Sequence, residues 1–165
     1  MLSKLLIGAA LASAQAQSGP QPCLSGEEVG DLVAVTMPFI VEGAAAQCRP
    51  HLGPDAFLLR QETRALVTRW REQTSDRAGR AAATFARMGG LPMSGSDPND
   101  MRVFGRMMAA YATRQMDAAK CRQVDILLRS LAPLPIDDIG RMMGALVTLT
   151  QSGRTGASGP QICPA

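Results

Sequence analysis

Apolar side chains recur every three to four residues along most of this chain, which is the period of an amphipathic α-helix. The clearest such stretch covers residues 23–48. Within it, Ser25 and Glu28 have the S-x-x-E spacing of a capping box, in which each side chain accepts a hydrogen bond from a backbone N–H of the first turn. The pattern therefore predicts a helix over 26–46, with a kink at Pro38 because proline removes one backbone hydrogen bond.

The same period predicts further helices along the rest of the chain. The segment 54–88 has two successive apolar faces, and the pattern leaves open whether it is one bent helix or two. After a Gly/Pro/Ser-rich loop at 91–96, the next apolar face changes phase near Asp117, which predicts a break there. The last face covers 136–150. Because no stretch alternates with a period of two between hairpin turns, we expect an all-α bundle of five or six helices.

The first residues have the parts of a secretory signal peptide. Lys4 precedes an apolar run at 5–12, and a small-residue Ala-x-Ala sequence ends at Ala16. The run is too short to span a bilayer, which needs about 20 residues. We therefore expect residues 1–16 to be a signal peptide and residues 17–165 to be a single helical domain, with no membrane span after cleavage.

The cysteines fit export, because an even number in a secreted chain most simply forms disulfides. They are Cys23, Cys48, Cys121 and Cys163. A helix over 26–46 is roughly 30 Å long, whereas a disulfide needs Cα atoms about 4.4–6.8 Å apart. Unless the helix folds back at Pro38 or Gly43, Cys23 therefore pairs with either Cys163 or Cys121, and Cys48 takes the other. We favour Cys23–Cys163 with Cys48–Cys121, which attaches a Gly/Ser/Pro-rich, flexible tail at 153–165 to the start of the domain.

Composition argues against nucleic acid as a partner. The net charge is +3 in 165 residues, with 17 basic and 14 acidic side chains, and no basic block stands out. Four Phe, one Tyr and one Trp leave few rings for base stacking. The expected partner is therefore not a nucleic acid.

No catalytic constellation is visible in the sequence. His51 is the only histidine and lies in a Pro/Gly-rich turn, and there is no G-x-S-x-G nucleophile motif. The acidic pairs at 27–28 and 137–138 fall in the first turns of predicted helices, where the helix dipole favours them. We expect no catalytic residues, and keep a small carboxylate-dependent cell-wall hydrolase as an alternative.

Methionines give a second alternative, because thioethers bind Cu(I) outside the cytoplasm. Most of them fall on apolar helical faces, where filling the core is their usual role. Met88, Met93 and Met101 flank the loop at 91–96 and are the only trio worth testing. We expect no cofactor and no metal site, with a Cu(I) or small-ligand carrier as the alternative built on residues 88–101.

Three arginines on the second helix are candidates for an interface. Arg60, Arg64 and Arg71 lie within about 40° of one another around a helix. Taken together, the sequence predicts an exported, periplasmic protein that acts by binding, as an inhibitor, an immunity-type protein or a chaperone-like module. Its expected partner is another exported or envelope protein, and unused helix faces also allow a homodimer.

Overall fold

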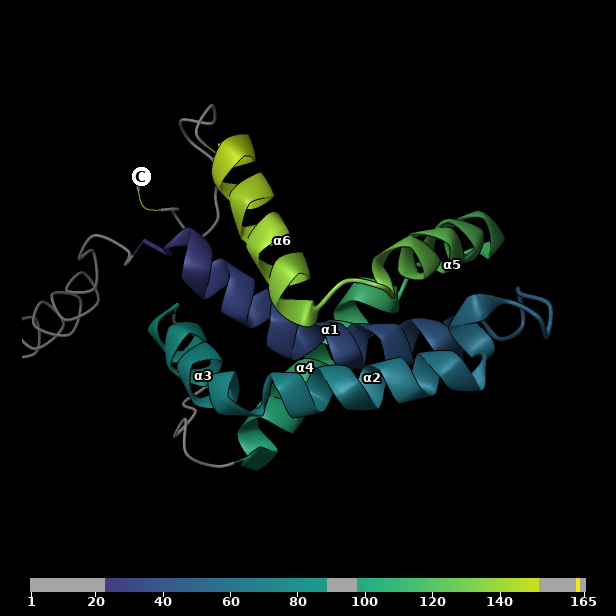
Figure 1. The fold of residues 1–165 in the computed structure, drawn as a ribbon, viewed down its shortest axis with the longest axis horizontal. Helices are drawn as coiled ribbons and strands as arrows, with labels where there is room; N and C mark the ends of the chain where they lie inside the picture. The colour runs from purple at the N-terminus through teal and green to yellow at the C-terminus, as the bar shows by residue number, and fades with distance from the viewer. Residues whose placement is uncertain (1–22, 89–97, 152–162, 164–165) are drawn as a thin grey trace, which may run out of the picture.

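The computed structural model describes residues 23–88, 98–151 and Cys163. These residues form six α-helices and no strand, which confirms the predicted all-α bundle. The α-helices are α1 (Gly26–Cys48), α2 (Gln61–Gln73), α3 (Ala78–Arg87), α4 (Pro98–Thr113), α5 (Ala118–Leu131) and α6 (Ile136–Gln151), and two 3-10 helices are η2 (Phe57–Leu59) and η3 (Ser75–Arg77). Figure 1 shows α1 running through the middle of the molecule, with the other helices arranged around it.

The predicted capping box starts α1. The backbone N–H of Ser25 donates to the Glu28 carboxylate at 2.8 Å, and the N–H of Glu28 donates to the Ser25 hydroxyl at 3.2 Å. The first of these bonds, helped by an ion pair with Arg87, holds the pKa of Glu28 below its usual value of 4.5. The helix continues through Pro38 and ends at Cys48.

By length and composition alone, α1 is apolar enough to cross a membrane. In the fold, however, α6, α4, α3 and α2 all pack against it. Its apolar side chains Val35, Val41 and Ala44 are buried by these neighbours. Packing inside the bundle therefore accounts for the apolar composition of α1.

Two disulfides hold the ends of α1, with the pairing that we favoured from the sequence. Cys23 is bonded to Cys163 with the Cα atoms 4.9 Å apart, and Cys48 to Cys121 with the Cα atoms 5.4 Å apart. The backbone N–H of Cys163 also donates to the Leu24 carbonyl oxygen at 2.9 Å. Disulfides of this kind persist in oxidising compartments, so the protein belongs to such an environment.

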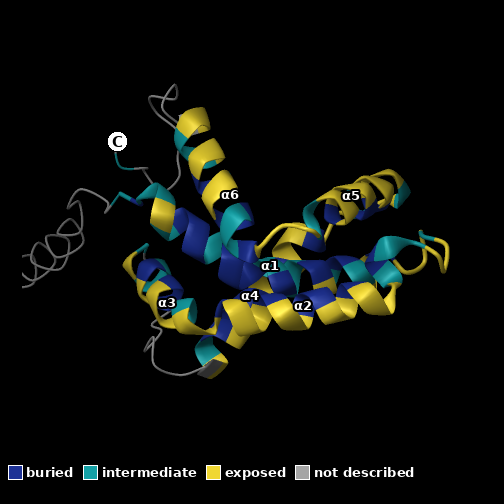
Figure 2. Ribbon diagram, in the orientation of Figure 1, coloured by how far each residue is buried: buried dark blue, intermediate teal, exposed yellow. Residues whose placement is uncertain are grey.

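The apolar core is divided into two clusters, and Figure 2 shows how the buried positions concentrate along α1. The larger cluster surrounds the fully buried Trp70 and includes Leu58 and Ile136. The smaller cluster joins α1, α3 and α4, where the rings of Phe85 and Phe104 lie 4.0 Å apart. The predicted faces are only partly buried: Ile136 and Ile139 of the last face lie in the larger cluster, whereas Leu146 and Leu149 of the same face are exposed.

The element boundaries resolve the points that the pattern left open. The segment 54–88 contains two α-helices, α2 and α3, separated by η3. The break near Asp117 is confirmed, because its side chain caps α5 by accepting from the Lys120 N–H at 2.8 Å. The predicted signal peptide at 1–16, the loop at 91–96 and the tail at 153–165 lie outside the described residues, Cys163 excepted.

Candidate functional site

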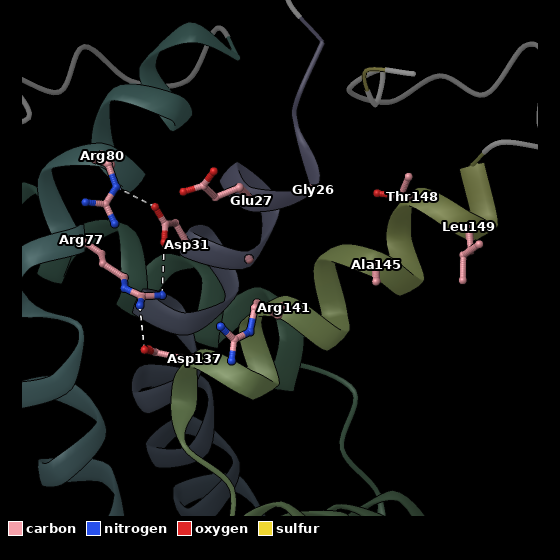
Figure 3. Close-up of a pocket in the computed structure, with 11 residues that line it drawn as sticks. Gly26, Glu27, Asp31, Arg77, Arg80, Asp137, Arg141, Ala145, Thr148 and Leu149 are labelled. Atoms are coloured by element: carbon pink, nitrogen blue, oxygen red, sulfur yellow. Dashed lines mark hydrogen bonds and ion pairs between the residues drawn. The ribbon is translucent and has the colours of Figure 1, made fainter. Parts of the chain in front are cut away.

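A cleft of about 710 Å³ opens between the start of α1, the η3–α3 junction and α6 (Figure 3). Charged side chains line one part of it and small or apolar side chains the rest. The charged residues are Glu27, Asp31, Arg77, Arg80, Asp137 and Arg141. The cleft lies at the N-terminal end of α1, which therefore forms one wall along its first two turns.

Glycines bring α1 and α6 together at the base of the cleft. Gly26 and Gly30 are one turn apart on α1, and Gly140 and Gly144 are one turn apart on α6, so each pair lies on a single helix face. A Cβ atom on Gly140 would come within 2.7 Å of the Gly30 carbonyl oxygen, and one on Gly30 within 3.0 Å of the Gly140 carbonyl oxygen. The two backbones therefore approach more closely than any other residue type would allow.

A chain of ion pairs crosses the cleft and joins its three walls (Figure 3). Asp31 of α1 is buried, and accepts from Arg80 Nε at 2.9 Å and from Arg77 at 3.4 Å. Arg77 also reaches Asp137 of α6 at 2.9 Å. The hydrogen bond to Asp31 raises the pKa of Arg80 above its usual value. These contacts fix α1, α3 and α6 relative to one another.

The opposite part of the cleft is apolar. Ala145 and Leu149 of α6 line it, and Leu149 has 71% of its surface exposed. Met142 and Leu146 are also exposed and continue the same stripe along α6, because residues three and four apart share a helix face. From Met142 to Gln151 the sequence contains no charged residue. The lip of the cleft is therefore an uncharged apolar ridge on α6.

The charges in the cleft are balanced. Three arginines and three carboxylates line it, so these six side chains carry no net charge. A net positive pocket would select anions by its field, whereas these six side chains give the cleft no net charge of either sign. Its chemistry suits a ligand that offers apolar surface to α6 and polar or charged groups to the opposite wall.

In the part of the chain that the structure describes, no histidine or free cysteine lines the cleft, whereas the carboxylates of Glu27, Asp31 and Asp137 do. His51 is exposed in the turn that follows α1, at the end of that helix away from the cleft. All four cysteines are in disulfides. Within the described residues, no group of three or more His, Cys, Asp or Glu is placed to hold a metal ion. The cleft itself presents ion-paired side chains and apolar surface.

Glu27 and Asp137, from the two acidic pairs noted in the sequence, line this cleft, whereas the three arginines predicted as an interface do not. Arg60 immediately precedes α2, and its Nε donates to the Asp55 carbonyl oxygen at 2.9 Å. Arg71 lies on the exposed side of α2 and pairs with Glu42. Arg64 is exposed on the same helix. Their role as an interface stays a prediction.

The methionine trio is only partly described. Met101 is buried in the α3–α4 cluster, Met88 is half-buried at the end of α3, and Met93 lies outside the described residues. A copper site at 88–101 therefore also stays a prediction.

Sequence reasoning missed the cleft because its charged residues come from three distant segments. Asp31 and Arg77 are 46 positions apart. One signal was present, since Asp31 interrupts the apolar stripe of the central helix and a buried carboxylate needs partners. The paired glycines on α1 and α6 were a second signal.

No protein-family model matches the chain, and no curated protein or solved structure matches it. The function is therefore argued from the geometry of the cleft itself.

Proposed function

We propose that the protein is an exported, periplasmic binding protein whose cleft receives an amphipathic segment of a partner protein. One observation supports this above all: a cleft of about 710 Å³ combines a wall of fixed ion pairs with an exposed, uncharged apolar ridge on α6. Protein interfaces commonly have this arrangement, with apolar contact at the centre and polar groups at the rim.

The proposed partner segment would place apolar side chains against Ala145 and Leu149. Its polar groups would face Glu27 and Arg80, both exposed on the opposite side of the cleft. Because the ion pairs and the glycine contact already fix the walls, little conformational entropy is lost when a ligand binds. Such a site favours binding without any chemical step.

Site-specific photo-crosslinking tests the proposal in cells that export the protein. A photoreactive phenylalanine analogue replaces Leu149 at the lip of the cleft in one variant. In the control it replaces Ile126, which is 66% exposed on α5. We expect irradiation to give a discrete adduct from position 149 and none of the same mass from position 126, with the partner identified by mass spectrometry.

Two results would contradict the proposal. One is the absence of any adduct at position 149 in a variant that is exported and keeps both disulfides. The other is the same adduct from both positions, which would show contact unrelated to the cleft.

A further inference from the structure

The outward face of α4 carries an exposed apolar stripe. Val103, Met107 and Tyr111 are spaced four residues apart and are 60%, 43% and 65% exposed. The opposite face of the same helix is buried against α1 and α3 through Met101 and Phe104. Large apolar side chains exposed in a row on one helix face are typical of an interaction surface.

Arginines accompany this stripe, without acidic residues between them. Arg102, Arg106 and Arg114 are exposed, and the sequence from Met101 to Met116 contains no Asp or Glu. No ion pair among the described residues involves any of the three. The Arg114 guanidinium lies 4.6 Å from the centre of the Tyr111 ring. This face therefore combines apolar surface with three arginines, and Asp100 in the first turn is the one acidic residue of α4.

From this combination we infer that α4 binds the surface of an anionic lipid bilayer. A helix with a basic polar face and exposed apolar side chains lies in the plane of the membrane interface, with its apolar side chains at the acyl boundary. Arginines beside them meet the lipid phosphates, and the phenol of Tyr111 suits the same depth. Charge complementarity thus identifies the occupant of this surface.

Other occupants fit less well. A second copy of the chain would bring the arginines of two α4 helices together, and like charges in contact oppose association. The centre of a protein interface is normally depleted of charged residues, whereas here arginines alternate with the apolar side chains. No residue of α4 lines the cleft, so this inference is independent of the proposed partner site.

Vesicle binding of the purified, disulfide-bonded protein tests the inference. Vesicles of phosphatidylglycerol and phosphatidylcholine in equal parts are compared with phosphatidylcholine alone at about 0.1 M salt. We expect binding to the anionic vesicles only, and a loss of that binding at 0.5 M salt. Each basic residue near an anionic surface changes the partition coefficient onto the membrane about fivefold. The double variant Arg106→Gln with Arg114→Gln should therefore have a partition coefficient roughly 25-fold lower. Met107→Asp abolishes binding.

The matched control is Arg69→Gln with Arg122→Gln, which removes the same charge from exposed positions on α2 and α5. We expect this control to bind within about twofold of the natural protein, and circular dichroism to show that all variants are folded. Three outcomes would overturn the inference. They are no binding to anionic vesicles, equal losses in control and α4 variants, or a lipid-free dimer that Met107→Asp dissociates, which would make the face a contact between copies.

Discussion

Asp31 is a buried carboxylate on the central helix, and two arginines surround it. Its side chain is only 8% exposed, whereas that of Arg80 is 57% exposed and that of Arg77 is 22% exposed. Removing one partner of a buried ion pair lowers the free energy of unfolding by more than the intact pair contributes to it. The reason is that the remaining charge stays buried without a counter-charge. Substituting Arg77 should therefore destabilise the fold more than substituting Arg80, since Arg77 also pairs with Asp137 of α6.

We predict that Arg77→Met lowers the free energy of unfolding by about 2–3 kcal/mol, somewhat less than for a fully buried pair because Arg77 retains some exposure. Asp31→Asn in the same chain should recover part of this loss, since a neutral amide needs no counter-charge. Urea denaturation of the two single variants and the double variant measures this coupling.

The control for this prediction is Arg141→Met. Arg141 lies at the rim of the same cleft with its side chain 78% exposed, and within the described residues its ion pair is with Asp138, three residues before it in α6. Exposed pairs of this kind contribute about 0–1 kcal/mol. If Arg77→Met cost no more than Arg141→Met, the chain of ion pairs would not be what holds the cleft.

Single residues of the cleft were hard to predict from the sequence for a physical reason. The first-turn position of Asp137 is fully explained by the helix dipole, so nothing local indicated that it also meets Arg77. The capping role of Ser25 and Glu28 was predictable, since a capping box depends only on residues within one turn. Contacts between distant segments depend on the fold and not on the local pattern.

At the scale of elements, the crossing of α1 and α6 sets the geometry of the cleft. Gly30, Gly140 and Gly144 of this crossing leave no room for a side chain between the helices, because an added Cβ would lie 3.0 Å or less from backbone oxygen. Glycine costs about 1 kcal/mol relative to alanine in a helix interior, so this arrangement exchanges helix propensity for close packing. The sequence pattern predicted both helices but not their contact, because periodicity identifies a buried face and not the face that covers it.

We predict that Gly140→Ala lowers the free energy of unfolding by about 1–3 kcal/mol, although alanine is the better helix former. The added methyl group would lie 2.7 Å from the Gly30 carbonyl oxygen, and backbone must move to relieve that contact. Thermal or urea denaturation measures the change.

Gly53→Ala is the control, because an added Cβ at that position has no atom within 4 Å. We expect it to change the free energy of unfolding by less than about 0.5 kcal/mol, as for most surface substitutions. A Gly140→Ala protein as stable as the natural one would show that α1 and α6 can separate without cost.

Over the whole molecule, the two disulfides constrain the chain on different scales. The Cys23–Cys163 bond spans 140 positions and the Cys48–Cys121 bond spans 73. In the chain-entropy model both contribute about 4–5 kcal/mol, and the longer loop contributes about 0.6 kcal/mol more. The pairing was predictable because a helix of fixed length excluded the local bond, and connecting the tail to the start of the domain favoured one of the two remaining choices.

Burial of the cysteines and the length of the closed loop predict opposite orders for the contributions of the two disulfides to stability. Cys48 and Cys121 are fully buried in the main core cluster beside Trp70, whereas Cys23 and Cys163 are half-buried at the end of α1. Replacing a buried pair by alanine therefore adds cavities, at about 1 kcal/mol for each methyl-sized gap. Two such gaps outweigh the roughly 0.6 kcal/mol that the entropy model assigns to the longer loop.

We predict that Cys48→Ala with Cys121→Ala destabilises the protein by at least about 1 kcal/mol more than Cys23→Ala with Cys163→Ala. Urea denaturation of the two double variants under identical conditions compares them directly, and the reverse order would mean that loop entropy, not core packing, dominates the stability of this bundle.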